Sequence, residues 1–258
     1  MRARAAETYV QRLERVTLNP LVHTTRGYYI LVGILVAIVT WGLYAYIVQF
    51  RFGLIGTGMR DQVSWGFYII NFVFFIGISH VGALISAILR LTNAGWRTPI
   101  ARIGELITFA ALLVGALMII IDLGRPDRML NLIAFGRFQS PLIWDVVGVA
   151  TYLVGSITYL YLPIIPDFAL MRDRLARQTS RVRHRIFSIL AIGWQNTPEQ
   201  ARRLAKANRI MTVSIIPIAI SVHTVVSFVF ASTLRPGWDS TILASNFVIG
   251  ALFSGIGG

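Results

Sequence analysis

The sequence predicts an all-α integral membrane protein, a bundle of about six transmembrane helices with a cytoplasmic N-terminus. Hydrophobic residues make up 55% of the 258 residues and charged residues only 14%, whereas soluble domains usually carry about 25% charged residues. A large buried core could also lower the charge. Six long apolar runs indicate transmembrane helices instead, because a helix that crosses the hydrocarbon needs about 20 mostly apolar residues.

The apolar runs follow one another along the whole chain. They cover residues 27–48, 65–89, 103–121, 143–165 and 210–231, and a sixth opens near Ile242 and continues to Gly258. Lipid offers no partner for backbone polar groups, so runs of this length form helices or closed barrel strands. Barrel strands alternate apolar and polar residues, and these runs do not, so we expect helices. The last run ends without a flanking charge, and we expect the protein to continue past Gly258.

Positive charge is unevenly shared between the two sets of connecting segments. Of the 24 Lys and Arg residues, 18 lie in 1–26, 90–102 and 166–209, and 6 lie in 51–64, 122–142 and 232–241. Loops rich in Lys and Arg stay in the cytoplasm, so the first set should be inside and the second outside. This pattern accounts for the net charge of +13 without nucleic acid, since the basic residues are not interleaved with aromatic residues for base stacking.

The runs and loops divide the chain into four parts. We expect a cytoplasmic segment over 1–26, a four-helix transmembrane bundle over 27–165, a basic cytoplasmic loop with short helices over 166–209, and further, incomplete transmembrane helices over 210–258. A basic helix expected over 173–192 lies either on anionic headgroups or against a cytoplasmic partner. Thr197, Pro198 and Glu199 are typical of the cap and first turn of a second short helix leading into the fifth span.

Ionisable side chains at membrane depth are costly, so each one is a functional candidate. Two are histidines near the middle of a run, His80 and His223. Glu105 lies near the inner side. Four lie at the outer interface: Asp122, Arg125, Asp145 and Asp239. The polar groups therefore gather toward the outer face, with the two histidines beneath them.

This arrangement suits a quinol, which has an apolar tail and a polar head that releases two protons with two electrons. A neutral imidazole can accept such a proton near pH 7, and a neighbouring carboxylate can pass it on. We therefore predict catalytic roles for His80, Asp122, Asp145 and Glu105, and cofactor binding by His80, Arg125, His223 and Asp239.

Each of these residues also has a structural interpretation. A buried histidine can simply hydrogen-bond a neighbouring helix. Asp122 and Asp145 can serve as interface residues and caps, and Arg125 can pair with either of them to hold its loop. Glu105 can extend to the cytoplasmic interface instead of carrying protons.

The absence of cysteine from the sequence excludes thiolate metal sites and iron–sulfur clusters bound by this chain alone. Two histidines on different helices can ligate a haem. His80 and His223 form the one pair of this kind, because His23 and His184 lie outside the runs. We predict no haem and no metal site.

A series of short motifs, ordered from about Trp65 to Gly255, carries a family resemblance. They are Phe74–His80, Leu84–Leu91, Asp122–Pro126, Ser140–Asp145 followed by Tyr152, Ile165–Asp167 with Arg172 and Asp173, Ser221–Val225, Pro236–Thr241 and Ala251–Gly255. Each motif alone is weak, and their order makes them fairly specific. Together they resemble the NrfD/PsrC family of quinone-interacting membrane subunits, and the fourth and fifth motifs are most similar to ActC and ActF of alternative complex III.

The resemblance implies a subunit that binds quinone or quinol (menaquinone or ubiquinone) in a four-helix bundle near the outer face, with no redox cofactor of its own. It implies an iron–sulfur subunit docked outside, other membrane subunits, and either c-type cytochromes or a molybdopterin-type subunit. Such a respiratory or photosynthetic oxidoreductase lies in the bacterial inner membrane, and proton movement through it is left open. Family members have eight or more spans, which also predicts that the chain is incomplete.

Two other functions compete with quinone binding. One is a membrane anchor that holds soluble subunits and has no quinone site of its own. The other is a secondary transporter, whose signature is broken helices in related halves. Pro217 interrupts the fifth run, but no matching break occurs in a related half.

Overall fold

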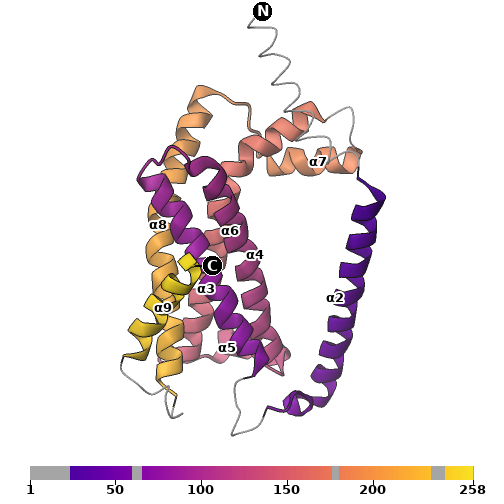
Figure 1. Cartoon of the computed structure of the whole chain (residues 1–258), viewed down its shortest axis with the longest axis vertical. Helices are drawn as coiled ribbons and strands as arrows, with labels where there is room; N and C mark the ends of the chain where they lie inside the picture. Colours follow the sequence, from indigo (N-terminus) through magenta and orange to yellow (C-terminus); the bar gives the residue numbers. More distant parts are fainter. Residues whose placement is uncertain (1–23, 60–65, 176–179, 234–241, 258) are drawn as a thin grey trace, which may run out of the picture. The chain divides into compact units, whose positions relative to one another are not determined.

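The computed structural model describes residues 24–59, 66–175, 180–233 and 242–257, which are built of helices and contain no strand (Figure 1). Five of the helices are long and apolar enough to cross a membrane: α2 (Arg26–Phe52), α3 (Phe67–Leu91), α4 (Arg97–Asp122), α6 (Pro141–Arg174) and α8 (Pro198–Ala231). The predicted class, an all-α multi-pass integral membrane protein, is confirmed.

Shorter helices join or follow the long ones. They are η1 (Leu54–Thr57), η2 (Pro126–Arg128), α5 (Met129–Phe135), α7 (Arg181–Leu190) and α9 (Leu243–Gly257). Helix α9 corresponds to the sixth apolar run but has only 15 residues, fewer than the about 20 needed to cross the hydrocarbon. The described residues therefore form five spans of full length and one short apolar helix, where the sequence predicts about six spans.

The chain forms two compact units. The first comprises Met1–Val48 and Ile164–Gln200, and the second comprises Gln49–Pro163 and Ala201–Gly258. Helices α6 and α8 each contribute to both units. The residues that line the candidate site all belong to the second unit.

The core of the second unit lies where α3, α4, α6 and α8 pack together. Its buried side chains include Phe72, Leu112, Tyr152, Ile215 and Val226. Short helix α9 packs against the same core through partly buried side chains near its start. Lipid tails are as apolar as these residues, so close van der Waals packing rather than the hydrophobic effect holds such a bundle together.

Helices α3 and α4 approach each other most closely at two glycines. A β-carbon on Gly82 would lie 2.6 Å from the carbonyl oxygen of Gly104 and 2.5 Å from the Thr108 hydroxyl. That hydroxyl donates to the carbonyl oxygen of Gly104 on its own helix at 2.8 Å and shares its proton with the carbonyl oxygen of Ser79 on α3 at 3.1 Å. Small residues at a crossing let two backbones approach, so this glycine pair determines how α3 lies on α4.

Helix α8 begins with a reciprocal cap. The amide of Gln200 donates to the Thr197 hydroxyl at 3.3 Å, and the Thr197 amide donates back to the Gln200 side-chain oxygen at 3.4 Å, the arrangement of a capping box. Pro198 is the first helical residue, as predicted. The predicted short helix and the fifth span are one continuous helix that also includes Pro217. Pro217 therefore supplies no broken helix for the transporter interpretation.

We expect Thr197→Ala to lower the free energy of unfolding by about 1 kcal/mol, because an amide in the first turn of α8 loses its acceptor. Denaturation followed by circular dichroism in detergent measures the change. The control is Thr197→Ser, which keeps the hydroxyl and should stay within about 0.5 kcal/mol of the parent. An equal loss in both variants would show that the hydroxyl does not cap α8.

The basic helix predicted over 173–192 is divided in the structure. Helix α6 continues to Arg174 and so covers the first residues of the predicted helix. Helix α7 begins after Ser180, whose hydroxyl accepts a hydrogen bond from the amide of Arg183. Val182, Ile186 and Ile189 have the spacing of one helix face and are exposed. An exposed apolar stripe on an otherwise basic helix suits both predicted positions, on anionic headgroups or against a cytoplasmic partner.

Candidate functional site

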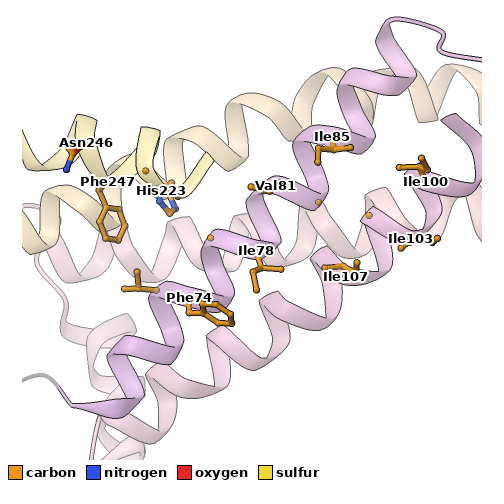
Figure 2. A pocket seen from close by; sticks show the side chains of 16 residues that line it. Phe74, Ile78, Val81, Ile85, Ile100, Ile103, Ile107, His223, Asn246 and Phe247 are labelled. Atoms are coloured by element: carbon orange, nitrogen blue, oxygen red, sulfur yellow. The ribbon is translucent and has the colours of Figure 1, made fainter. Parts of the chain in front are cut away.

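A cavity of about 870 Å³ lies between α3, α4, α8 and α9 of the second unit (Figure 2). His223 and Asn246 supply the polar side chains of its lining, and both lie at the end that α9 helps to form. The far end is lined by Ile85, Ile100 and Ile103. An apolar cavity with a few polar groups is the usual form of a small-molecule site, and here the polar groups gather at one end.

His223 brings α8 to the wall of this cavity. The side chain is only 2% exposed, and its ring stacks on Phe247 with centroids 4.9 Å apart. Among the described residues, neither ring nitrogen has a partner that meets ordinary hydrogen-bond distance and angle limits, although the backbone of Phe247 lies near the ring. A buried polar group without a partner costs about 1–3 kcal/mol, so a ligand that offers the missing hydrogen bond would be favoured here.

His80 lies behind His223 and does not line the cavity. Its Nδ1 is 2.7 Å from the carbonyl oxygen of Ile76 on α3, and its Nε2 is 2.6 Å from that of Ala219 on α8. Its ring packs on Tyr152 with centroids 4.6 Å apart. The structural alternative, a hydrogen bond to a neighbouring helix, is therefore observed for His80. Its contact with a quinone head stays a prediction.

The two carbonyl groups around His80 determine what each form of its ring can do. A neutral imidazole has one N–H and donates to one of them, whereas the doubly protonated ring donates to both. His80 can therefore accept a proton without turning its ring. The rings of His80 and His223 are in edge contact, with centroids 4.6 Å apart, so the pair connects the cavity with the interior of the bundle.

Two serine–tyrosine pairs repeat along α3 and α6. The Ser79 hydroxyl donates to Tyr152 at 3.0 Å, and the Ser86 hydroxyl lies 3.0 Å from that of Tyr159. Both members of the second pair lie seven residues after those of the first, two helical turns along each helix. Polar groups therefore extend from His80 toward the predicted inner end of the bundle.

Glu105 ends this series of polar groups, and it is only 1% exposed. One carboxylate oxygen accepts hydrogen bonds from Ser86 at 2.8 Å and from the Arg90 guanidinium at 2.9 and 2.5 Å. The single proton of Ser86 goes to Glu105, so Tyr159 donates to Ser86. The alternative in which Glu105 extends to the cytoplasmic interface is wrong, because the carboxylate finds its partners on α3 inside the bundle.

Among the described outer residues, no hydrogen bond or ion pair joins Asp122, Arg125 and Asp145 to one another. Asp122 ends α4 and Asp145 lies in the first turns of α6. Each has a buried oxygen without a hydrogen-bond partner among the described residues. Arg125 pairs with Asp127 at 2.8 Å, so the alternative in which it pairs with either of those aspartates is wrong. Asp127 is only two residues from Arg125, so it lies within reach of the guanidinium. The hydrogen bonds from Arg125 hold the pKa of Asp127 below its usual range. Asp239 lies outside the described residues.

The prediction gave no site role to Arg90, Asn246 and Phe247, nor to the two serine–tyrosine pairs. Asn246 is the one amide side chain in the sixth apolar run, and this was a usable signal. In the sequence Arg90 looks like an inner-loop charge, and only the fold turns its guanidinium toward Glu105. Phe247 resembles any other apolar residue of its run.

The fold and the cavity define a class, a multi-pass helical membrane protein with a mostly apolar cavity inside its bundle. The family described as polysulphide reductase, NrfD, matches residues 56–258. The chain belongs to this family.

The chain is similar to three curated proteins, two of them named as membrane subunits. It is 32% identical over 227 residues to a putative dimethyl sulfoxide reductase membrane subunit of Halobacterium salinarum, covering 87% of this chain and 48% of the relative. It is 26% identical to a selenate reductase subunit of Mesobacillus selenatarsenatis, covering 83% and 51%. It is 24% identical to the Hdr-like menaquinol oxidoreductase integral membrane subunit of Archaeoglobus fulgidus, covering 89% and 49%. The chain thus spans about half the length of these relatives.

Proposed function

We propose that the chain is a quinone- or quinol-binding membrane subunit of a multi-subunit oxidoreductase. One observation carries the proposal: a mostly apolar cavity ends at His223, a buried imidazole without an ordinary hydrogen-bond partner among the described residues. A quinone head offers carbonyl or hydroxyl groups to such a ring, and the rest of the molecule is apolar. Family membership and a relative named as a menaquinol oxidoreductase subunit support the same ligand class.

At this site His223 would hold the head group and Asn246 would supply a further donor and acceptor. When a quinol is oxidised, it loses two electrons and two protons. A neutral His223 can take one proton directly. His223 would pass this proton on toward Asp122 and Asp145 and then take the second one. His80, in edge contact with His223 and held by two carbonyl groups, would orient the His223 ring. In this proposal His80 acts behind the head group, which revises the direct contact predicted from the sequence, because His223 and not His80 lines the cavity.

The electrons would pass to an iron–sulfur subunit docked at the predicted outer face. Several apolar side chains are exposed in the segment that follows Arg125, among them Leu130, Ile133 and Phe135. Exposed apolar groups beside the exposed Arg125–Asp127 pair fit a surface that a partner covers. Asp122 and Asp145 would provide the proton exit on this side.

Proton movement across the membrane is a further part of the proposal, and Glu105 would be its inner carrier. Tyr159 and Ser86 form a hydrogen-bonded series that ends on the Glu105 carboxylate. The second carboxylate oxygen has no hydrogen-bond partner among the described residues and is free to accept a proton there. The Arg90 guanidinium holds the other oxygen in place.

The partners distinguish two kinds of complex. Likeness to ActC and ActF predicts alternative complex III, with an iron–sulfur subunit and c-type cytochromes. The relatives named as reductase subunits instead favour a molybdopterin-type partner. Purification in mild detergent, followed by identification of the attached subunits, separates the two. We propose a bacterial inner membrane as the location, and the Halobacterium relative extends the choice to an archaeal cytoplasmic membrane.

We expect His223→Leu to weaken binding of a photoreactive naphthoquinone about 10-fold, which corresponds to the loss of one hydrogen bond of about 1.4 kcal/mol. The full chain in lipid nanodiscs is irradiated with increasing probe. Labelled peptides are then identified by mass spectrometry, and in the parent chain they should include residues 73–85 and 246–251.

The matched control for this experiment is His184→Leu, which removes a histidine of α7 that does not line the cavity and should leave labelling unchanged. A second variant, Gly250→Val, adds bulk where a β-carbon meets nothing within 4 Å, so it should fill the cavity without disturbing the fold. Equal labelling of all four chains would rule out a quinone in this cavity and favour the anchor function.

A further inference from the structure

We propose that the far end of the cavity, lined by Ile85, Ile100 and Ile103, is a subsite for the isoprenoid tail of the quinone, so that the site selects long-tailed quinones. The inference rests on the proposed head-group site at His223 and adds the direction of the tail and a preference by tail length. In the predicted orientation the tail points toward the cytoplasmic leaflet.

The length of the cavity is the first argument. Its lining extends along α3 from Val73 to Ile85, roughly 18 Å at the helical rise per residue. A quinone ring system at the His223 end occupies only part of this length. Figure 2 shows Ile85, Ile100 and Ile103 at the end away from His223, and no polar side chain lines that part.

The glycine crossing of α3 and α4 keeps the two ends of the cavity connected. Gly82 and Gly104 both line the cavity and belong to the helices that flank its middle. Neither carries a side chain that could divide it. The same residues that bring the two backbones together therefore leave a continuous apolar path beside the crossing.

The lining also limits what can occupy the far end. Ile103 is 57% exposed, so in a membrane this end is open to lipid and a flexible tail can enter from the side. No charged side chain lines the cavity, so a phosphate group finds no cation at the His223 end. A long apolar chain attached to a neutral head group fits both ends, whereas a phospholipid fits only by inserting an acyl chain.

The test compares two quinones on two tryptophan variants of the full chain in nanodiscs. Ile103→Trp places bulk in the far end. Leu106→Trp is the matched control, since Leu106 lies on the same helix and is 54% exposed but does not line the cavity. Menaquinone-4, which has a tail, and menadione, which has none, each displace the photoreactive naphthoquinone, with concentrations expressed per bilayer lipid.

In the parent chain and in Leu106→Trp, menaquinone-4 should displace the probe at about 10-fold lower concentration than menadione. In Ile103→Trp this advantage should fall to about 3-fold or less, with menadione unchanged. An advantage that survives in Ile103→Trp overturns the tail subsite, as does a phospholipid that co-purifies with the parent chain and is lost from Ile103→Trp. If neither quinone displaces the probe from the parent chain, the proposed head-group site itself has failed.

Discussion

Replacing Arg90 by methionine should destabilise the protein by about 3–5 kcal/mol, because it leaves the Glu105 carboxylate buried without its cation. Glu105 is 1% exposed, and the Arg90 guanidinium supplies two of the three hydrogen bonds to its bonded oxygen. The buried carboxyl group then costs free energy in either form. The ionised form has no counter-ion, and the neutral form must first take up a proton.

The double variant Arg90→Met with Glu105→Met should recover most of this loss, since replacing both partners of a buried ion pair by apolar side chains is often neutral or stabilising. Reversible unfolding in mixed micelles, followed by circular dichroism, measures all three chains. The control is Arg97→Met at the same predicted inner side, where the guanidinium donates to the exposed side chain of Asn93 and the change should stay within about 0.5 kcal/mol. A double variant as unstable as Arg90→Met would contradict the pairing.

The second large effect is expected at the crossing of α3 and α4. Gly82→Ala should cost about 3 kcal/mol, at the upper end of the usual range for overpacking, because the added methyl group meets the Gly104 carbonyl oxygen at 2.6 Å. A backbone oxygen cannot rotate away as a flexible side chain can. The two helices must therefore separate, and the contact of the Thr108 hydroxyl with the Ser79 carbonyl oxygen should break as they do.

The matched control is Gly77→Ala on the same helix, where the new β-carbon would meet only that of Ala251 at 3.9 Å, an ordinary contact. It should unfold within about 1 kcal/mol of the parent. The same micelle titration compares both variants. The chain has no cysteine, so a cysteine pair added to α3 and α4 can report helix separation by cross-linking. Equal stability of Gly82→Ala and Gly77→Ala would show that the crossing is looser than the structure describes.

The spans could be predicted because membrane insertion depends on a one-dimensional property, the length of an apolar run. All five long helices include most of a predicted run. Their ends differ where polar residues continue the helix beyond the hydrocarbon. Helix α8 begins at Pro198, twelve residues before the apolar run, because a capping box and good helix formers extend it. Helix α6 continues to Arg174 in the same way.

The site was predicted in its residue types more than in their roles. Both histidines and Glu105 stand out in the sequence as ionisable groups at membrane depth. Which histidine faces the cavity depends on the rotation of each helix about its axis and on the chain that packs against it. Residues of α9, far away in the sequence, form the wall beside His223, and no local pattern contains that information.

The sequence by itself contains the length of each apolar run and the uneven distribution of Lys and Arg between the two sets of connecting segments. The first determines that this protein is a multi-pass helical membrane protein, and the second predicts its orientation. Only the tertiary structure decides that His80 is held between two backbone carbonyl groups, that Arg90 satisfies Glu105, and that His223 lacks an ordinary partner among the described residues at the end of an apolar cavity. The physical reason is that insertion into lipid depends on the summed hydrophobicity of each segment, whereas hydrogen bonds depend on side-chain positions that are set when the helices pack.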